Sequence, residues 1–419
     1  MRACPRTLSV LLLGLCLSHA ACVNDGPELA LSVRARQLHE RLLTLDTHLD
    51  TPASLASAGW DIMQTHAYGK DLSQVDYPRM VVGGLDGGFW AIYTSQGPRT
   101  PEGHAHARDA ALQAAVRIHE MVARNPQQFE LAHTADDASA IAARGKRVVY
   151  LSIENSYPLG HDLTLLQTFY SLGVRLVGPV HFANNDLGDS ATDPKGKEWN
   201  GLSELGKQLV SEANRLGMVL DASHGSDDVF DQMLALSTTP IMLSHSGCKA
   251  VFDHPRNLDD ARLRKLAAAG GVIQINSLSD YLIPTPENPE RKAAQQKLFA
   301  DYGRLFGSDV AGRAEFARRK QAFDAQYPAP RASVDDFMAH LLHALAVIGP
   351  DHVGIGADWD GGGGVIGLED VAAIPRITER LIAKGYDEAS LQKIWSGNAL
   401  RVLRAAEQAK AGAAAPAVH

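Results

Sequence analysis

The stretch GLSELGKQLVSEANRLGMVLDASH, residues 201–224, contains one helix followed by one strand. Ser203 precedes a run with apolar residues at helical spacing, and Gly217 follows that run. Serine and glycine are typical of the first and last caps of a helix. The apolar run that begins at Met218 predicts a buried strand, and it ends in His224. The segment therefore predicts one unit of an α/β fold, with a chemically active side chain at the end of its strand.

The same alternation of strand and helix recurs along the chain. Eight apolar runs have the length of buried strands: Leu43–Asp50, Gly88–Thr94, Val148–Glu154, Arg175–His181, Met218–His224, Pro240–His245, Val272–Asn276 and Val353–Asp358. Helical patterns lie at about 105–125, 162–173, 202–216, 226–237, 258–270, 334–348 and 368–410. Because continuous apolar strands are typical of a parallel sheet covered on both faces, eight units predict an α/β fold of the (β/α)8 TIM barrel type. The alternative is an open doubly wound sheet.

Residues 283–331 interrupt this pattern between the seventh and eighth strands. The segment is rich in Ala, Arg, Lys, Glu and Gln, and proline pairs bracket it. We therefore expect a helical insertion in a barrel domain that spans residues 38–405. It is a candidate lid over the site or a candidate contact in a homodimer. The Ala-rich end, residues 410–419, is expected to be disordered.

Composition and the first residues limit the class of protein. The 419 residues carry 40 Lys and Arg against 48 Asp and Glu, a net charge of -8, so no basic excess favours a nucleic-acid partner. Residues 1–22, MRACPRTLSVLLLGLCLSHAAC, predict a signal peptide, and hence an exported protein. Cys22 leaves two alternatives, a free periplasmic protein or a lipoprotein anchored through this cysteine. Cys248 is expected to be a buried small apolar residue.

Residues that can bind a metal or transfer a proton end six of the eight candidate strands: His48 with Asp50, Glu154, His181, His224, His245 and Asp358. In a TIM barrel the carboxyl ends of the strands meet at one mouth, where the active site lies. Each residue alone would more often be structural, but the joint pattern favours one site. Neutral imidazoles and carboxylates suit zinc, and two such ions would balance the gathered carboxylates.

Seven segments resemble the membrane dipeptidase (renal dipeptidase) family, zinc peptidases of the amidohydrolase superfamily. They are LDTHLDTP (45–52), SIENSYPLG (152–160), VHFANND (180–186), residues 201–224, PIMLSHS (240–246), HPRNLDD (254–260) and IGADWDG (355–361). The resemblance implies two zinc ions per chain. His48 and Asp50 would hold one zinc, His224 and His245 the other, and Glu154 would bridge the two.

The resemblance also implies the activity and the residues that contact substrate. The expected reaction is hydrolysis of L-L or L-D dipeptides by a hydroxide that bridges the metals. His181 would contact the scissile carbonyl and Asp358 would transfer the proton. Arg256 would bind the substrate carboxylate, and Tyr281 matches a substrate-binding tyrosine. Taken alone, Arg256 could instead pair with Asp259 or Asp260 on the surface.

Other functions remain open from the sequence. A related amidohydrolase could act on N-acyl amino acids, lactones or phosphotriesters. A barrel of this kind could also bind dipeptides or metal without catalysis, or use one metal as a lyase or isomerase.

Overall fold

The computed structural model describes residues 32–414, so the expected signal peptide and Cys22 lie outside the described residues. Each of the eight strands expected from the sequence is present. They are β1 (Leu45–Leu49), β2 (Gly87–Ile92), β4 (Arg147–Ile153), β5 (Val174–Val177), β6 (Val219–Leu220), β7 (Met242–Cys248), β9 (Val272–Ile275) and β10 (Val353–Ile355). Their side chains are almost entirely buried, as expected of apolar strands in a covered parallel sheet.

These eight strands form a closed parallel barrel. One sheet has the order β1-β2-β4-β5-β6, and the other contains β10-β9-β7. The two sheets are joined where the Ala222 N–H donates to the Met242 carbonyl (2.8 Å) and the Asp50 N–H donates to the Trp359 carbonyl (2.9 Å). The TIM barrel expected from the sequence is confirmed, and the open sheet is excluded. Two short strands were not expected: β3 (Phe129–Leu131) pairs with β4, and β8 (Asn257–Leu258) pairs with β7.

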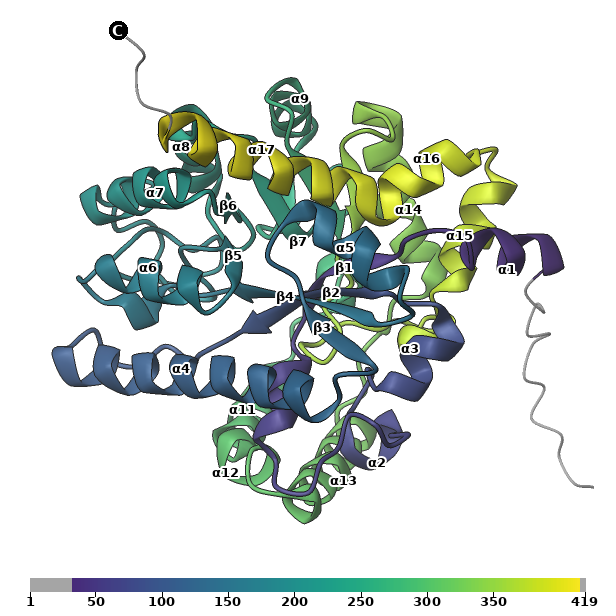
Figure 1. The fold of residues 1–419 in the computed structure, drawn as a ribbon. Helices are drawn as coiled ribbons and strands as arrows, with labels where there is room; N and C mark the ends of the chain where they lie inside the picture. Colours follow the sequence, from purple (N-terminus) through teal and green to yellow (C-terminus); the bar gives the residue numbers. More distant parts are fainter. Residues whose placement is uncertain (1–31, 415–419) are drawn as a thin grey trace, which may run out of the picture.

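Helices surround the barrel (Figure 1). Those near the expected positions are α4 (Pro101–Arg124), α6 (Thr164–Ser171), α7 (Glu204–Leu216), α8 (Asp227–Leu236), α9 (Asp260–Ala268) and α14 (Val334–Ile348). Ser203 caps α7 by accepting the Gly206 N–H, and Gly217 ends it with a φ of 72°, which confirms both caps. Further elements are α1 (Val33–His39), η1 (Thr51–Ala56), α2 (Tyr68–Asp71), α3 (Tyr77–Gly83), α5 (Ala135–Ala142) and η2 (Tyr157–Leu159).

The helical stretch expected over 368–410 is divided into several elements. They are η3 (Val371–Ala373), α15 (Pro375–Ala383), α16 (Glu388–Gln392), a π-helical turn (Lys393–Gly397) and α17 (Asn398–Ala414). Gly385, with a φ of 89°, separates α15 from α16 because this backbone conformation ends a helix. α17 continues to Ala414, so the start of the Ala-rich stretch 410–419 is helical rather than disordered. Residues 415–419 lie outside the described residues.

The insertion between β9 and β10 is helical, as the sequence indicates. It contains α11 (Pro289–Ala300), α12 (Tyr302–Phe306) and α13 (Val310–Gln326), which follow the short helix α10 (Ser279–Leu282). Figure 1 shows α11, α12 and α13 grouped beside α2 at one edge of the molecule. The Ser57 hydroxyl donates to the Phe306 carbonyl (2.5 Å), and the Ala58 N–H donates to the Ser308 carbonyl (3.0 Å). The insertion is therefore fixed to the chain just after β1, close in sequence to Asp50.

Two smaller observations complete the fold. Cys248 is fully buried, as expected of a small apolar residue. Within residues 32–414 no helix combines the length and apolar character needed to cross a bilayer.

Candidate metal centre

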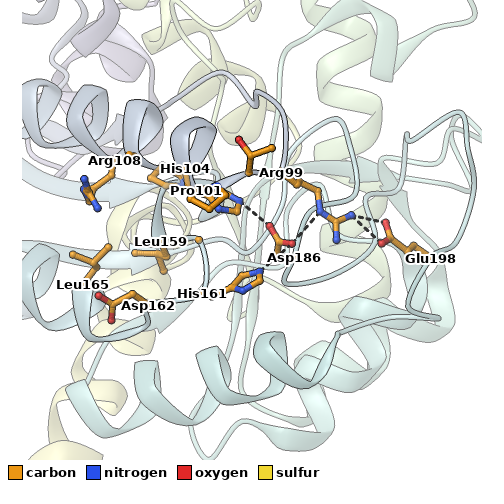
Figure 2. A pocket seen from close by; sticks show the side chains of 14 residues that line it. Arg99, Pro101, His104, Arg108, Leu159, His161, Asp162, Leu165, Asp186 and Glu198 are labelled. Carbon is orange, nitrogen blue, oxygen red and sulfur yellow. Dashed lines mark hydrogen bonds and ion pairs between the residues drawn. The ribbon is translucent and has the colours of Figure 1, made fainter.

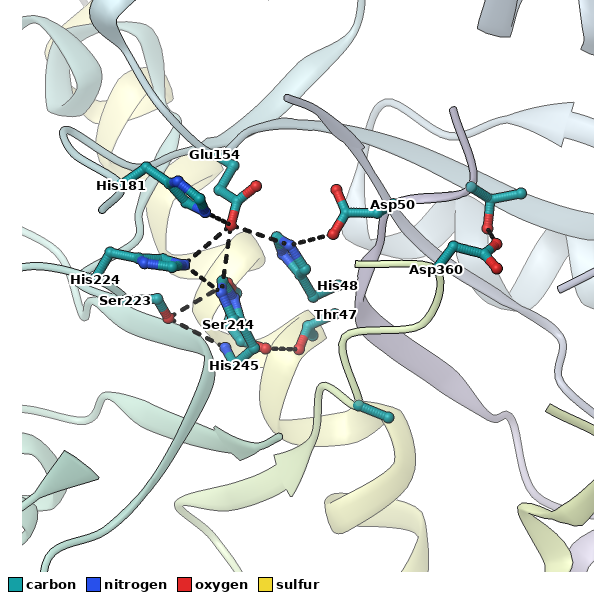
Figure 3. Close-up of polar contacts among 12 residues, drawn as sticks. Thr47, His48, Asp50, Glu154, His181, Ser223, His224, Ser244, His245 and Asp360 are labelled. Atoms are coloured by element: carbon teal, nitrogen blue, oxygen red, sulfur yellow. Dashed lines mark hydrogen bonds and ion pairs between the residues drawn. The ribbon is translucent and has the colours of Figure 1, made fainter. Parts of the chain in front are cut away.

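The strand-end residues that the sequence selects lie together at the carboxyl ends of the barrel strands (Figure 3). Glu154, just after β4, is at the centre of the group. Its Oε1 lies 3.0 Å from Nε2 of His224, 3.4 Å from that of His181, and 3.5 Å from those of His48 and His245. One buried carboxylate oxygen thus faces four histidines from four different strands or their following loops.

A second part of the centre lies on the other side of His48. The His48 Nε2 is 3.4 Å from Asp50 Oδ2, and both residues are on or next to β1. Ligand atoms of His48, Asp50 and Asp358 lie within 4.8 Å of one another, and so do those of His48, Glu154 and His245. Glu154 and His48 therefore connect the two halves of the centre.

Most of these side chains lie just beyond the strands and not in them. β5 ends at Val177, so His181 belongs to the following loop, although the sequence placed it at the strand end. His224 and Asp358 each have a φ of 66°, a left-handed conformation that costs free energy for residues other than glycine. Such strain is typical of active sites, where it directs a side chain that a regular strand would point elsewhere.

A glycine after β10 leaves room for two carboxylates. A Cβ at Gly361 would lie 2.0 Å from Asp50 Oδ2 and 2.3 Å from Asp358 Oδ1. Asp360, next to it, is buried and accepts hydrogen bonds from the Gln74 N–H (2.6 Å) and the Thr51 hydroxyl (2.8 Å). These contacts hold the loop against the chain after β1.

Burial and neighbouring charges set the protonation of the centre. Burial lowers the pKa of both His224 and His245 well below the usual value, so both imidazoles are neutral. Burial opposes ionisation of Glu154, but His181 and His48 hold the pKa of that carboxyl well below its usual range. Burial raises the pKa of Asp358 well above its usual value, and the carboxylates of Asp50 and Glu154 add to this effect.

This donor set fits divalent cations. Neither ring nitrogen of the buried His48 has a hydrogen-bond partner among the described residues. The Nε2 atoms of His224 and His245 lie 2.8 Å apart, and both face the Glu154 carboxylate. Cations between these groups would use the free lone pairs and offset the repulsion of Asp50, Glu154 and Asp358. Imidazole nitrogen and carboxylate oxygen are ligands that zinc prefers.

A buried polar layer, which the sequence did not predict, lies beneath the centre. Asp221 Oδ1 accepts the N–H groups of Ser223 and Ser244, both at 2.9 Å, and Asp221 Oδ2 accepts the Ser244 hydroxyl. The same hydroxyl lies 2.8 Å from Nδ1 of His245. Asp46 has the corresponding role between β1 and β10, where it accepts the N–H groups of His48 (2.9 Å) and Ala357 (3.0 Å). Each carboxylate joins two neighbouring strands just before their site residues.

Arg256 lies beside the metal centre and not on the surface. It is 4% exposed, and its Nη2 donates to the His245 carbonyl at 3.0 Å. Its Nε has no partner among the described residues, and its guanidinium lies 5.2 Å from the ring of Tyr281. Asp259 instead caps α9 and pairs with Arg262, so the alternative in which it pairs with Arg256 is wrong. Burial raises the pKa of Tyr281 to about 12, so this phenol is neutral and can donate a hydrogen bond.

A separate surface cavity of about 760 Å³ lies beside the start of α4 (Figure 2). Asp186 is at its centre, 2.9 Å from His104 Nε2, 3.3 Å from His161 Nε2 and 3.0 Å from Arg99 Nε. Neither His104 nor His161 belongs to the metal centre. These contacts tie α4 and the loop after β4 to the loop after β5, and that last loop carries His181.

A closed parallel barrel with histidines and carboxylates gathered at its strand ends is the architecture of metal-dependent hydrolases. Residues 32–417 match the family model described as membrane dipeptidase (peptidase family M19), and the chain belongs to this family. It is therefore a metal-dependent dipeptidase.

Known relatives agree with this assignment. Dipeptidase tcpJ of Claviceps purpurea is 31% identical over 82% of this chain and 72% of its own. Dipeptidase 3 of Mus musculus is 30% identical over 80% of this chain and 59% of its own. The crystal structure of the probable dipeptidase PvdM from Pseudomonas aeruginosa is 30% identical, with a TM-score of 0.76 over 90% of this chain and 98% of that one. A Rhodobacter sphaeroides metallopeptidase, solved with a phosphinate mimic of L-Ala-D-Ala, is 26% identical, with a TM-score of 0.68 over 87% of this chain and 99% of that one.

Proposed function

We propose that this dipeptidase acts through a binuclear zinc centre held by five residues: His48, Asp50, Glu154, His224 and His245. The position of Glu154 Oε1, within 3.5 Å of His48, His224 and His245, carries the proposal. An oxygen in that position suits a carboxylate that bridges two cations. Zinc bound there would lower the pKa of a water molecule, so that the water could act as a nucleophile near neutral pH.

The residues of the chain would handle the proton and the carbonyl oxygen. Asp358 would accept a proton from the attacking water and pass it to the leaving amine. Burial and the neighbouring carboxylates raise the pKa of Asp358, which makes its ionised form a stronger base for this proton. His181 Nε2 faces the centre 3.4 Å from Glu154, and from there it would donate a hydrogen bond to the carbonyl oxygen as negative charge develops.

Arg256 would fix the carboxylate of the substrate. Its buried guanidinium has an unpaired Nε, and a carboxylate can accept two parallel hydrogen bonds from such a group. Tyr281, which lies beside it, would add a neutral hydrogen-bond donor. Because Arg256 binds the carbonyl of His245, the carboxylate would lie next to the metal centre, which suits a substrate of two residues. The relative crystallised with a mimic of L-Ala-D-Ala supports testing both L-L and L-D dipeptides.

A substrate panel with an Arg256→Met variant tests this proposal. We expect the wild-type protein to hydrolyse dipeptides in preference to N-acetyl amino acids and lactones. In the variant, kcat/KM for dipeptides should fall by about 10–100-fold because a charge-assisted hydrogen bond is lost. Arg264→Met, a change at an exposed arginine, is the matched control and should have no effect. Faster hydrolysis of lactones or N-acetyl amino acids than of dipeptides would refute the proposed substrate class.

An Asp358→Asn variant tests the proton transfer. Asparagine keeps the shape of the side chain but cannot accept and release a proton at neutral pH. We expect kcat to fall by about 10²–10⁴-fold, while the zinc content stays that of the wild-type protein. Wild-type kcat in this variant would show that another group transfers the proton.

We also propose that the protein is exported, which rests on the sequence of residues 1–22 alone. Fractionation of cells that express wild-type and Cys22→Ala protein separates the two alternatives. A lipoprotein would move from the membrane to the soluble fraction in the variant. A free periplasmic protein would be soluble in both, and retention of both in the cytoplasm would refute export.

A further inference from the structure

Two aromatic rings next to His181 are exposed to solvent. Tyr93 is 38% exposed and Phe182 is 52% exposed. The centroid of the Phe182 ring lies 3.9 Å from that of His181 and 5.4 Å from that of His224, and the Tyr93 ring lies 4.8 Å from His181. These rings leave apolar area in water at the edge of the metal centre. A ligand that covers them would gain the free energy of burying that area.

The order of strands in the barrel indicates which end of a dipeptide reaches these rings. Arg256 is anchored to the carbonyl of His245, on β7. In the closed barrel, β2 is four strands from β7 in either direction, so the two strands face one another across the mouth. Tyr93 directly follows β2. A dipeptide with its carboxylate at Arg256 and its carbonyl at His181 would therefore place its amino-terminal residue on the Tyr93 side.

The insertion adds a third aromatic ring on that side. Tyr302, the first residue of α12, stacks on Phe306 (4.6 Å) and contacts the edge of Phe316 (5.2 Å). Burial raises the pKa of Tyr302, and the carboxylates of Asp50 and Asp360 act in the same direction, as does Tyr93. The hydrogen bond from Ser57 to Phe306 fixes α12 to the chain after Asp50. Tyr302 therefore belongs to the part of the insertion that is fixed beside the chain after β1, near enough to Asp50, Asp360 and Tyr93 for their charges to act on it.

We propose that Tyr93, Phe182 and Tyr302 form the wall that binds the side chain of the amino-terminal residue, and that they select dipeptides with a large apolar or aromatic side chain at that position. This inference rests on the proposed function, because it needs the carboxylate of the substrate at Arg256. An acidic side chain in the same place would lose its hydration without a partner on these rings. The insertion would then contribute to specificity and not only to the outer surface.

A dipeptide series tests the proposed wall. We expect kcat/KM of the wild-type protein for Phe-Ala and Leu-Ala to exceed that for Gly-Ala and Asp-Ala by about 10–100-fold. In the Phe182→Ser and Tyr302→Ser variants the ratio of Phe-Ala to Gly-Ala should fall by about tenfold, chiefly through KM for Phe-Ala. Leu236→Ser, which alters an exposed leucine at the end of α8, is the matched control and should keep the wild-type ratio. Zinc content equal to that of the wild-type protein shows that each variant is folded.

The outcomes separate this inference from the proposed function. If both variants hydrolyse dipeptides with the wild-type ratio of Phe-Ala to Gly-Ala, the three rings do not form the proposed wall. The proposed function would be unaffected by this result. A change confined to the second position, measured with Ala-Phe against Ala-Gly, would also overturn the proposed wall, because the rings would then contact the carboxyl-terminal residue. A wild-type protein that hydrolyses no dipeptide would overturn both.

Discussion

At the scale of single residues, His245 differs from His48 and His224 in the surroundings of its Nδ1 atom. The Ser244 hydroxyl lies 2.8 Å from His245 Nδ1 and itself donates to Asp221. Nδ1 must then carry the proton, which leaves the Nε2 lone pair directed toward Glu154 and a metal. The Nδ1 atoms of His48 and His224 have no such partner among the described residues. Asp221 and Ser244 therefore position one candidate ligand without touching the metal themselves.

Removal of the Ser244 hydroxyl should weaken metal binding. We expect Ser244→Ala to lower zinc affinity by about 10–100-fold, because His245 loses the partner that fixes its tautomer. Competition with a chelator measures the affinity without any assay of activity. Ser54→Ala is the matched control, since Ser54 is equally buried but its hydroxyl has no partner among the described residues. Equal losses of zinc affinity in the two variants would show that the Ser244 hydroxyl does not act on the metal through His245.

A methyl group at Gly361 should disturb the centre directly. The added Cβ would lie 2.0 Å from Asp50 Oδ2 and 2.3 Å from Asp358 Oδ1, so both carboxylates would have to move away from their present positions in the centre. We expect Gly361→Ala to lose at least one zinc per chain and most dipeptidase activity. Gly303→Ala, where the added Cβ meets no atom within 4 Å, is the control. Normal zinc content in Gly361→Ala would mean that Asp50 and the loop can separate without loss of metal.

The candidate ligands could be predicted from the sequence because each lies at or just beyond the end of an apolar run. Chain order and strand polarity alone bring such positions to one mouth. Asp46, Asp221 and Ser244 could not be predicted, because their roles depend on which backbone groups of a neighbouring strand lie opposite them. His181 lies beside Glu154 but not at a strand end, where the sequence predicts it, since β5 stops at Val177 and the loop continues.

At the scale of elements, the eight strands and the helical character of 283–331 followed from composition and periodicity. The division of residues 368–410 into several helical elements could not be predicted in this way. A glycine at a helix end and a π-helical turn leave the spacing of apolar residues almost unchanged. The short strands β3 and β8 each have three residues or fewer, too few for a pattern to show. The place where the insertion docks depends on tertiary contacts, which no local pattern encodes.

Arg313 connects the insertion to the chain after β1. It is fully buried, and its Nη2 donates to the Asp71 carbonyl (3.0 Å) and the Ser73 hydroxyl (2.9 Å). Its guanidinium also lies 3.8 Å from the ring of Phe306. We expect Arg313→Ala to destabilise the docked insertion by about 2–4 kcal/mol through lost hydrogen bonds and an unfilled cavity.

Limited proteolysis measures this effect. Cleavage within residues 289–326 should become faster in Arg313→Ala, because the insertion opens more often. Arg318→Ala, on the same helix but largely exposed, should be cleaved at the wild-type rate. Equal cleavage rates in all three proteins would show that Arg313 does not hold the insertion.

At the scale of the whole molecule, His39 ties the first helix to the last part of the chain. Its Nε2–H donates to the Gly83 carbonyl (2.9 Å), and its Nδ1 accepts the Thr378 hydroxyl (2.6 Å). Trp395 in turn donates to that hydroxyl (2.8 Å). Burial lowers the pKa of His39 from 6.5 to about 4. The folded protein therefore binds fewer protons here than the unfolded chain between these two pH values.

The sign of this shift predicts a loss of stability in acid. The contribution of a neutral His39 is fully present above pH 6.5 and is lost as the pH falls toward 4. Between pH 7.5 and pH 5 it should remove roughly 2 kcal/mol of the free energy of unfolding. Urea unfolding at both pH values measures the free energy of unfolding. Its decrease between pH 7.5 and pH 5 should be smaller by this amount in His39→Gln than in the wild-type protein, whereas His352→Gln should show the wild-type decrease. An identical fall in His39→Gln would show that other groups cause it.

The zinc content per chain shows whether the mouth of the barrel holds a pair of cations. Elemental analysis of the purified wild-type protein, with dipeptide hydrolysis measured on the same sample, gives the answer. We expect about two zinc ions per chain in active protein, and a loss of zinc together with activity in His245→Ala. Active protein that holds one zinc ion or none would contradict a binuclear centre bridged by Glu154.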